Sequence, residues 1–258
     1  MARDAAGRDA AAVVSAARHA ALRRERAAAE HIPYSAHLAP QVITSVRGDY
    51  LQTFRLAGAS FESADDAQLN AWHERLNVLW RNLASAELSL WTHLVRRPVR
   101  ASMAAVAGEG FAARLAARYR ERLAGETLMA NELYLTLIYR PAAGAAAGFL
   151  ARLLARSGQA ELRRERATAL ETCEKLAQML RASLARYEPE PLGIYRDGPR
   201  WYSALLEFLA LLVNGEGCRV PLPGGPLAQA LPSTRVMFGN EAIEYRSAVA
   251  TRVGAVLG

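Results

Sequence analysis

The residues that could bind a nucleotide phosphate are few in this chain. A P-loop requires the pattern G-x-x-x-x-G-K-[ST], in which glycines let backbone N–H groups wrap the phosphates and the lysine reaches the β- and γ-phosphates. The 258 residues include one lysine, Lys175, which follows Glu174 inside a helical pattern with no glycine nearby. The chain therefore contains no complete P-loop. Gly144–Gly148 copies only part of the glycine spacing, and we interpret it as a linker.

Other catalytic and metal-binding patterns are also missing from the sequence. It has no G-x-G-x-x-G fingerprint, no G-x-S-x-G elbow and no H-E-x-x-H, and Cys173 and Cys218 form no CxxC. His31 and His37 flank a proline turn and could meet, but two histidines alone make a poor metal site. A Ser-His-Asp triad assembled in space stays open, because its members need no fixed spacing. We expect no catalytic, cofactor-binding or metal-binding residue, and a binding or structural domain.

Positive charge is concentrated in one segment. The chain carries a net charge of +7, and the stretch from residue 94 to residue 122 has a local excess of +5. Such a patch could face anionic lipid, nucleic acid or an acidic partner, although a solvated face is the simpler interpretation. The candidate interaction patch consists of seven arginines: Arg96, Arg97, Arg100, Arg114, Arg118, Arg120 and Arg122.

The first part of the chain predicts a helix followed by a hairpin. Residues 1–30 are rich in alanine and arginine and predict a helical extension with a thin apolar face. Residues 31–37 predict an extended segment. Apolar and polar residues then alternate over 42–46 and 50–56, and Gly48 between them can supply the positive φ of a tight turn.

Helices and strands alternate through the middle of the chain. Leucines and Trp72 recur every three or four residues after Ser63, which predicts a helix capped by that serine and ending near Leu83. Further expected elements are a strand over 87–97, an arginine-rich helix over 112–123, a strand over 131–141 and a helix over 159–186. The strand over 131–141 is apolar on both faces, as is typical of a central strand covered by helices.

The last third predicts a turn-rich connection, one helix and short strands. Prolines and glycines mark the connection over 189–199, and Trp201, Leu205 and Phe208 lie at helical spacing within a predicted helix over 200–213. Expected strands cover 235–238, 243–246 and 251–258, the last of which looks cut off before its end. This order predicts an α+β fold, an α/β sandwich in which long amphipathic helices pack on a mixed sheet that begins with the N-terminal hairpin.

Several short motifs follow one another along the chain. They begin with His31–Tyr34, Gly48–Leu51 and Gly58–Glu62. The others are Leu69-Asn70, Leu76-Asn77, Leu90–His93, Arg96-Arg97, Asn131–Pro141, Gly193–Tyr195, Trp201–Gly215 and Arg235–Glu244. Each motif alone is weakly specific, but together, in this order over residues 31–258, they resemble the N-terminal region of the CagE/TrbE/VirB family of type IV secretion and conjugal transfer ATPases. Ala57 stands where that family would carry an acidic residue.

The resemblance implies a role in a secretion apparatus. It predicts that residues 31–258 are the N-terminal domain of a motor ATPase whose RecA-like C-terminal domain, with ATP and magnesium, is absent from this chain. Such a domain would anchor the motor to the inner-membrane complex for pilus biogenesis and for transfer of protein or DNA. The expected partners are other inner-membrane secretion subunits, the protein's own ATPase domain and further copies in a hexamer, with the membrane surface as another candidate. The expected location is cytoplasmic, peripheral to the inner membrane.

A second class of function stays open beside this one. A stand-alone basic nucleic-acid-binding or assembly protein would also suit the sequence pI of about 9.8. However, the aromatic residues lie at core periodicities and not between arginines on one strand face, as base-stacking platforms require. Direct DNA binding is therefore not expected. The sequence leaves the transferred substrate undetermined.

Overall fold

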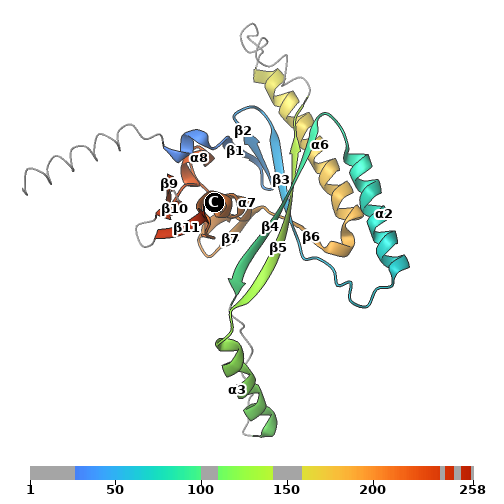
Figure 1. Ribbon diagram of the computed structural model, residues 1–258. Coiled ribbons are helices and arrows are strands. Elements are labelled where there is room, and N and C mark those ends of the chain that lie inside the picture. Colours follow the sequence, from blue (N-terminus) through green and yellow to red (C-terminus); the bar gives the residue numbers. More distant parts are fainter. Residues whose placement is uncertain (1–26, 100–109, 142–158, 239–241, 247–250, 257–258) are drawn as a thin grey trace, which may run out of the picture. The chain divides into compact units, whose positions relative to one another are not determined.

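The computed structural model describes residues 27–99, 110–141, 159–238, 242–246 and 251–256. Its internal contacts divide the chain into two compact units, one formed by residues 36–205 and the other by residues 1–35 together with 206–258. Helices and antiparallel sheets make up both units, which confirms the α+β class (Figure 1). The predicted linker at Gly144–Gly148 lies outside the described residues.

The larger unit is built on one sheet. Its strands follow the order β1-β2-β3-β5-β4, with the short β6 pairing to β3. Every pairing in this sheet whose register is described is antiparallel, and no parallel pair occurs among them. The strands are β1 (Tyr34–Ala39), β2 (Val42–Ser45), β3 (Tyr50–Leu56), β4 (Leu88–Val99), β5 (Leu128–Tyr139) and β6 (Pro189–Pro191).

The predicted N-terminal hairpin is confirmed as β2 and β3. Gly48 adopts φ 89°, the positive value that the turn requires. The Ser45 hydroxyl oxygen accepts hydrogen bonds from the backbone N–H groups of Arg47 and Asp49, both at 3.1 Å. β2 therefore ends at Ser45, one residue before the predicted end, and Val46 lies exposed in the turn.

β5 is the central strand, as its two apolar faces predict. It pairs with β3 on one side and with all twelve residues of β4 on the other. Leu135 and Leu137 join the main apolar core with Phe54 of β3. On the opposite face the Thr136 hydroxyl shares a buried hydrogen bond of 2.9 Å with the Thr53 hydroxyl, so both faces of the strand are buried.

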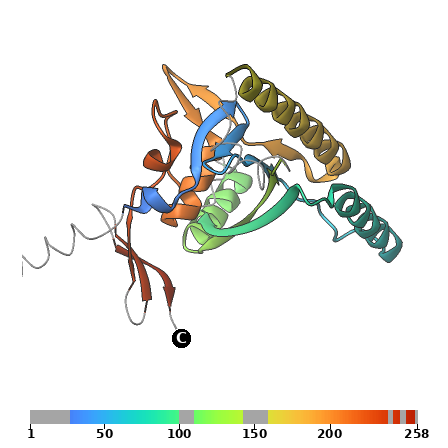
Figure 2. The same ribbon diagram turned by 90° about the horizontal axis from the view of Figure 1, so that it is seen from above.

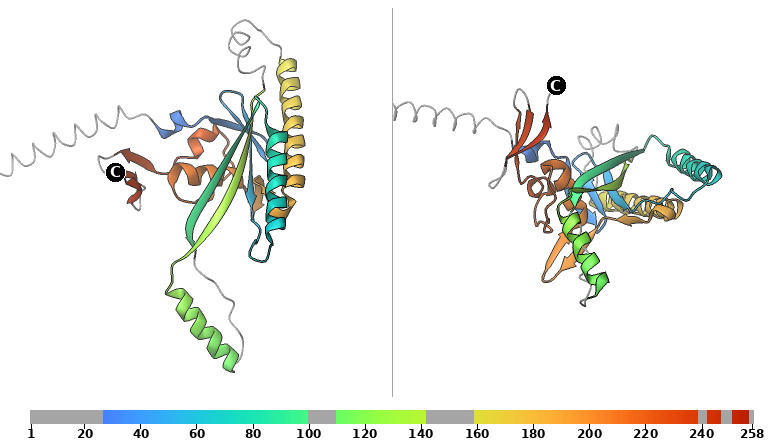
Figure 3. Two further views of the ribbon diagram at one scale, coloured as in Figure 1. Left: turned by 45° about the vertical axis from the view of Figure 1, so that its right-hand side comes forward. Right: turned by 60° about the horizontal axis from the view of Figure 1, so that its bottom comes forward.

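Two long helices cover the Phe54 face of the sheet. α2 (Asp66–Leu83) and α6 (Gln159–Ser183) lie side by side there (Figure 3). Leu79 and Leu83 of α2 and Leu180 of α6 meet in the core, where each is buried because its apolar stripe faces the sheet.

The ends of both helices differ from the prediction. Asp65, and not Ser63, caps α2, and its carboxylate accepts the Gln68 N–H at 2.7 Å. α6 ends at Ser183, and the 3₁₀ turn η2 (Ala185–Tyr187) follows it. This turn brings the Arg186 guanidinium over the Trp72 ring at 3.3 Å from the ring centroid.

The helix predicted over 200–213 begins four residues later than expected. Residues Arg200–Ser203 form strand β8, which pairs with β7 (Ile194–Asp197) across a two-residue turn where Gly198 has φ 57°. Helix α7 then runs from Ala204 to Asn214. Trp201 is consequently an exposed strand residue and not part of a buried helix face.

The smaller unit contains most of α7, a short sheet and two short helical segments. Its strands β9 (Arg235–Phe238), β10 (Ala242–Arg246) and β11 (Thr251–Val256) pair in the order β11-β10-β9, drawn in red in Figure 2. The helical segments are η1 (Ala28–His31) and α8 (Leu227–Ala230). The predicted N-terminal helix lies mostly outside the described residues, and its described end, η1, is a 3₁₀ turn.

One buried amide organises the chain around the end of α7 within this unit. The Asn214 side chain donates to the carbonyl oxygens of Ala210 and Leu231, both at 2.8 Å. Its oxygen accepts from the Ser233 N–H at 2.8 Å and from the Thr234 N–H and hydroxyl at 3.1 and 2.9 Å. The side chain thus ties the loop after α8 to the helix end.

Candidate docking surface

Most of the arginines that the sequence singles out lie on one helix, α3 (Phe111–Ala124). The predicted helix over 112–123 is confirmed with one more residue at each end, and only Gly125–Thr127 separates it from β5. No residue of α3 is buried. We call the basic arm the outer part of β4, residues Arg96–Val99, together with α3 (Figure 1).

An apolar stripe runs along α3. Phe111, Leu115 and Tyr119 follow one another at intervals of four residues, which places them on one side of the helix. Their exposed fractions are 74%, 57% and 53%. Side chains of this size normally lie against other apolar groups, so this stripe has the character of a contact surface.

A row of arginines borders the apolar stripe. Arg114, Arg118 and Arg122 each follow a stripe residue by three positions, so the row runs beside the stripe along the helix. Within the described part of the chain, Arg114 and Arg118 form no ion pair, while Arg122 lies 3.6 Å from Glu126. Arg120 lies apart from the row, and its Nε donates to the Ala116 carbonyl at 3.3 Å.

The remaining predicted arginines belong to the strand side of the basic arm. Arg96 and Arg97 are exposed residues of β4, and Arg97 pairs with Glu132 of β5. Glu132 also accepts a hydrogen bond from the Tyr134 hydroxyl at 2.9 Å. Burial, together with this hydrogen bond, raises the pKa of Tyr134 to about 12. Arg97 is thus partly neutralised, and Arg100 lies outside the described residues.

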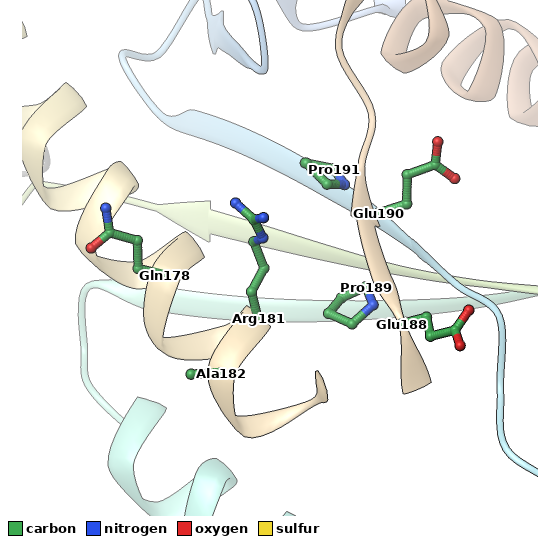
Figure 4. A pocket seen from close by; sticks show the side chains of 7 residues that line it. All are labelled: Gln178, Arg181, Ala182, Glu188, Pro189, Glu190 and Pro191. Carbon is green, nitrogen blue, oxygen red and sulfur yellow. The ribbon is translucent and has the colours of Figure 1, made fainter. Parts of the chain in front are cut away.

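A pocket among the described residues of the larger unit has no histidine, cysteine or serine in its lining. It is an open hollow of about 650 Å³ between the end of α6 and β6. Arg181 projects from α6, the rings of Pro189 and Pro191 form the facing wall, and the carboxylates of Glu188 and Glu190 extend away from it (Figure 4). Glu190 pairs instead with Arg55 at 2.6 Å.

The histidine and cysteine that the sequence drew attention to have structural surroundings. His37 lies 3.0 Å from the Ser203 hydroxyl through Nε2 and 3.3 Å from the Ala39 carbonyl through Nδ1. Burial lowers the pKa of His37, so the neutral ring is favoured. Cys173 packs in an apolar cluster with Val42 and Tyr50, and burial raises the pKa of its thiol to about 12. A thiol with this pKa is a poor nucleophile or metal ligand at neutral pH.

The arginines of α3 were singled out from the sequence, but the apolar stripe beside them was not. The signal was present in the four-residue spacing of Phe111, Leu115 and Tyr119. A stripe of this kind ordinarily predicts a buried face, and only the structure shows that none of the described elements buries it. Among the described residues, no helix is both long enough and apolar enough to cross a membrane.

Comparison with known families defines the class of protein. The family model described as the N-terminal domain of the type IV secretion system ATPase VirB4/TrbE matches residues 41–146. Residues 190–258 match the CagE, TrbE, VirB family, described as a component of the type IV transporter system. The first match covers most of the main sheet together with α3, and the second covers α7 and the small sheet.

Individual relatives agree with this class. The chain is 35% identical over 237 residues to the type IV secretion system protein PtlC homolog of Bordetella bronchiseptica, which is 89% of this chain and 28% of that protein. It is 34% identical over 238 residues to the type IV secretion system protein virB4 of Brucella suis, which is 90% of this chain and 28% of that protein. It is 32% identical over 241 residues to virB4 of Bartonella henselae, which is 92% of this chain and 30% of that protein. The chain belongs to the VirB4/TrbE family of type IV secretion ATPases and spans under a third of the length of these relatives.

Proposed function

We propose that this chain is the docking region of a type IV secretion motor ATPase, which it anchors to the inner-membrane complex. The observation that carries this proposal is the basic arm, because α3 exposes an apolar stripe and an arginine row that no other part of the described chain covers. A surface that combines apolar and cationic groups is suited to binding and has no direct use in hydrolysis.

The chemistry of the full-length protein would lie elsewhere. The P-loop is missing from this sequence, so ATP and magnesium would bind to a RecA-like C-terminal domain outside this chain. In this proposal the motor is a homo-hexamer at the cytoplasmic face of the inner membrane, where it works with other secretion subunits. Its ATP hydrolysis serves pilus biogenesis and the transfer of protein or DNA.

The location can be tested by fractionation of cells that contain the secretion apparatus. The triple variant R96E/R97E/R100E of the full-length protein should lower the membrane-bound share while the protein stays folded. The variant R163E/R164E/R181E is a matched control, since it makes the same change of charge at exposed positions of α6. Unchanged cofractionation of the R96E/R97E/R100E variant would contradict the proposal.

The alternative function, a stand-alone basic nucleic-acid-binding or assembly protein, is favoured by the net charge of +7 and by the exposed aromatic rings beside the arginines of α3. Binding through phosphates weakens steeply as salt rises, and base stacking needs aromatic faces. The DNA alternative therefore predicts tight binding of the 258-residue chain to single-stranded DNA, with a steep dependence on salt. The docking proposal predicts weak binding that does not change when Phe111 is replaced by leucine.

A further inference from the structure

We propose that α3 is an interfacial helix that binds an anionic lipid bilayer. Phe111, Leu115 and Tyr119 would enter the boundary between headgroups and acyl chains, while Arg114, Arg118 and Arg122 bind lipid phosphates. The inference rests on the proposed docking function and names the surface that the basic arm contacts. In this inference lipid, and not another protein, covers the apolar stripe.

The geometry of α3 suits a helix that lies on a bilayer. Its 14 residues correspond to about 21 Å of helix. This is shorter than the hydrocarbon core of about 30 Å, which a helix of about 20 residues spans. The apolar residues occupy one side, and the row Arg114, Arg118 and Arg122 borders that side. Helices that lie in the membrane interface share this arrangement of an apolar face with a cationic border.

The charge of α3 favours an anionic surface. The helix carries four arginines and a single acid, Glu121, which leaves an excess of +3. The three arginines beside the stripe can place their guanidinium groups at headgroup level while their aliphatic stems cover apolar surface. Lipid phosphates are anionic, and a guanidinium group can bind a phosphate through two hydrogen bonds. A bilayer therefore offers phosphates to the arginine row and apolar chains to the apolar stripe at the same time.

Other occupants of the stripe fit less well. A second copy of the chain would bring an identical arginine row against the first, and like charges at close range oppose pairing. Single-stranded nucleic acid could neutralise the arginines and stack on Phe111, but Leu115 at the centre of the stripe offers no ring for a base. A lipid bilayer satisfies the arginines and covers all three apolar side chains.

The test uses lipid vesicles prepared without membrane proteins, to which only the purified chain is added. The purified chain is sedimented with vesicles of phosphatidylcholine alone and with vesicles of equimolar phosphatidylglycerol and phosphatidylcholine. We expect binding only to the acidic vesicles, and we expect R114E/R118E/R122E and F111S/L115S each to weaken it at least about tenfold. R114K/R118K/R122K should retain most of the binding, and R163E/R164E/R181E should bind like the wild type because it changes net charge equally elsewhere.

Insertion of the apolar stripe into the bilayer is measured separately with an environment-sensitive fluorophore. In a C218S background, one label is attached at L115C within the stripe and another at A117C on the opposite side of the helix. Acidic vesicles should shift the emission of the first label to the blue and leave the second unchanged. Equal shifts at both positions, or none, would overturn the insertion of the stripe.

The outcomes separate this inference from the docking function. Failure of the wild-type chain to bind acidic vesicles overturns the lipid inference, and binding that survives F111S/L115S overturns it too. If the chain then still fractionates with membranes of cells that contain the apparatus, but not with those that lack it, docking stands and its partner is a protein. Loss of both vesicle binding and cell-membrane association would end both proposals.

Discussion

The centre of the main sheet and the basic arm use similar apolar side chains in opposite ways. Phe54 of β3 is fully buried between the sheet and helices α2 and α6, while Phe111 of α3 is 74% exposed. Burial of a large aromatic side chain is a main source of folding free energy. The sheet centre should therefore carry the stability of the larger unit, whereas the arm contributes little to folding and remains free to bind.

The largest expected effect tests this contrast directly. Phe54→Ala should lower the free energy of unfolding by about 3–5 kcal/mol, because it leaves a cavity that the packed sheet and helices cannot close. Phe111→Ala removes the same group from an exposed site and should change the free energy by less than about 0.5 kcal/mol. Urea unfolding followed by circular dichroism measures both, and similar losses would show that the arm is part of the core.

The buried amide of the smaller unit should come next. Asn214→Ala removes the partner of two carbonyl oxygens, two N–H groups and one hydroxyl around the end of α7. Each buried group left without a partner costs about 1–3 kcal/mol, but water can reach some of these groups. We therefore expect the free energy of unfolding to fall by about 2–4 kcal/mol in total. Hydrogen exchange should then rise first over residues 231–234, and uniform exchange across the chain would contradict this account.

A smaller effect is expected at the threonine pair inside the sheet. Thr53→Val should lower the free energy of unfolding by about 1–2 kcal/mol, because it leaves the buried hydroxyl of Thr136 without its partner. The double variant T53V/T136V removes both hydroxyls and should recover part of that loss. A double variant whose loss equals the sum of the two single losses would show that the hydroxyls do not interact.

The pH dependence should be the smallest effect. Burial lowers the pKa of His37, so below its usual value of about 6.5 the unfolded chain binds a proton before the folded chain does. Stability should therefore fall as pH decreases from about 6.5 to the lowered pKa, and it should not depend on this group above that range. His37→Gln should flatten this part of the pH profile of urea unfolding, and an unchanged profile would assign the dependence to another group.

Local patterns along the sequence predicted most of the larger unit. The alternating hairpin, the doubly apolar central strand and the leucine stripes of α2 and α6 each appeared near the expected residues. In these elements the residue spacing and the burial agree, because each apolar stripe packs against the same sheet.

The errors arose where pairing with a distant segment overrides the local pattern. Trp201, Leu205 and Phe208 lie at helical spacing, yet Trp201 belongs to β8, whose partner strand β7 lies within a segment rich in turn residues. β6 was missed for a similar reason, since two of its three residues are prolines and its pairing to β3 depends on where α6 ends. Propensity alone does not predict such short strands.

The candidate surface was predicted in part. The arginine count pointed to helix α3, but it also included Arg97, which is paired with Glu132. The sequence alone did not distinguish an apolar stripe that is buried from one that is left exposed, because both have the same spacing. Whether these arginines bind anything stays a prediction.

The most direct test of the account compares stability with membrane association in the same variants. We would measure urea unfolding and membrane cofractionation for the wild type, R114E/R118E/R122E and the matched control R163E/R164E/R181E. We expect all three proteins to unfold at similar urea concentrations, and we expect only R114E/R118E/R122E to leave the membrane fraction. If that variant stays with the membrane while folded, the basic arm is not the docking surface, and the central claim is contradicted.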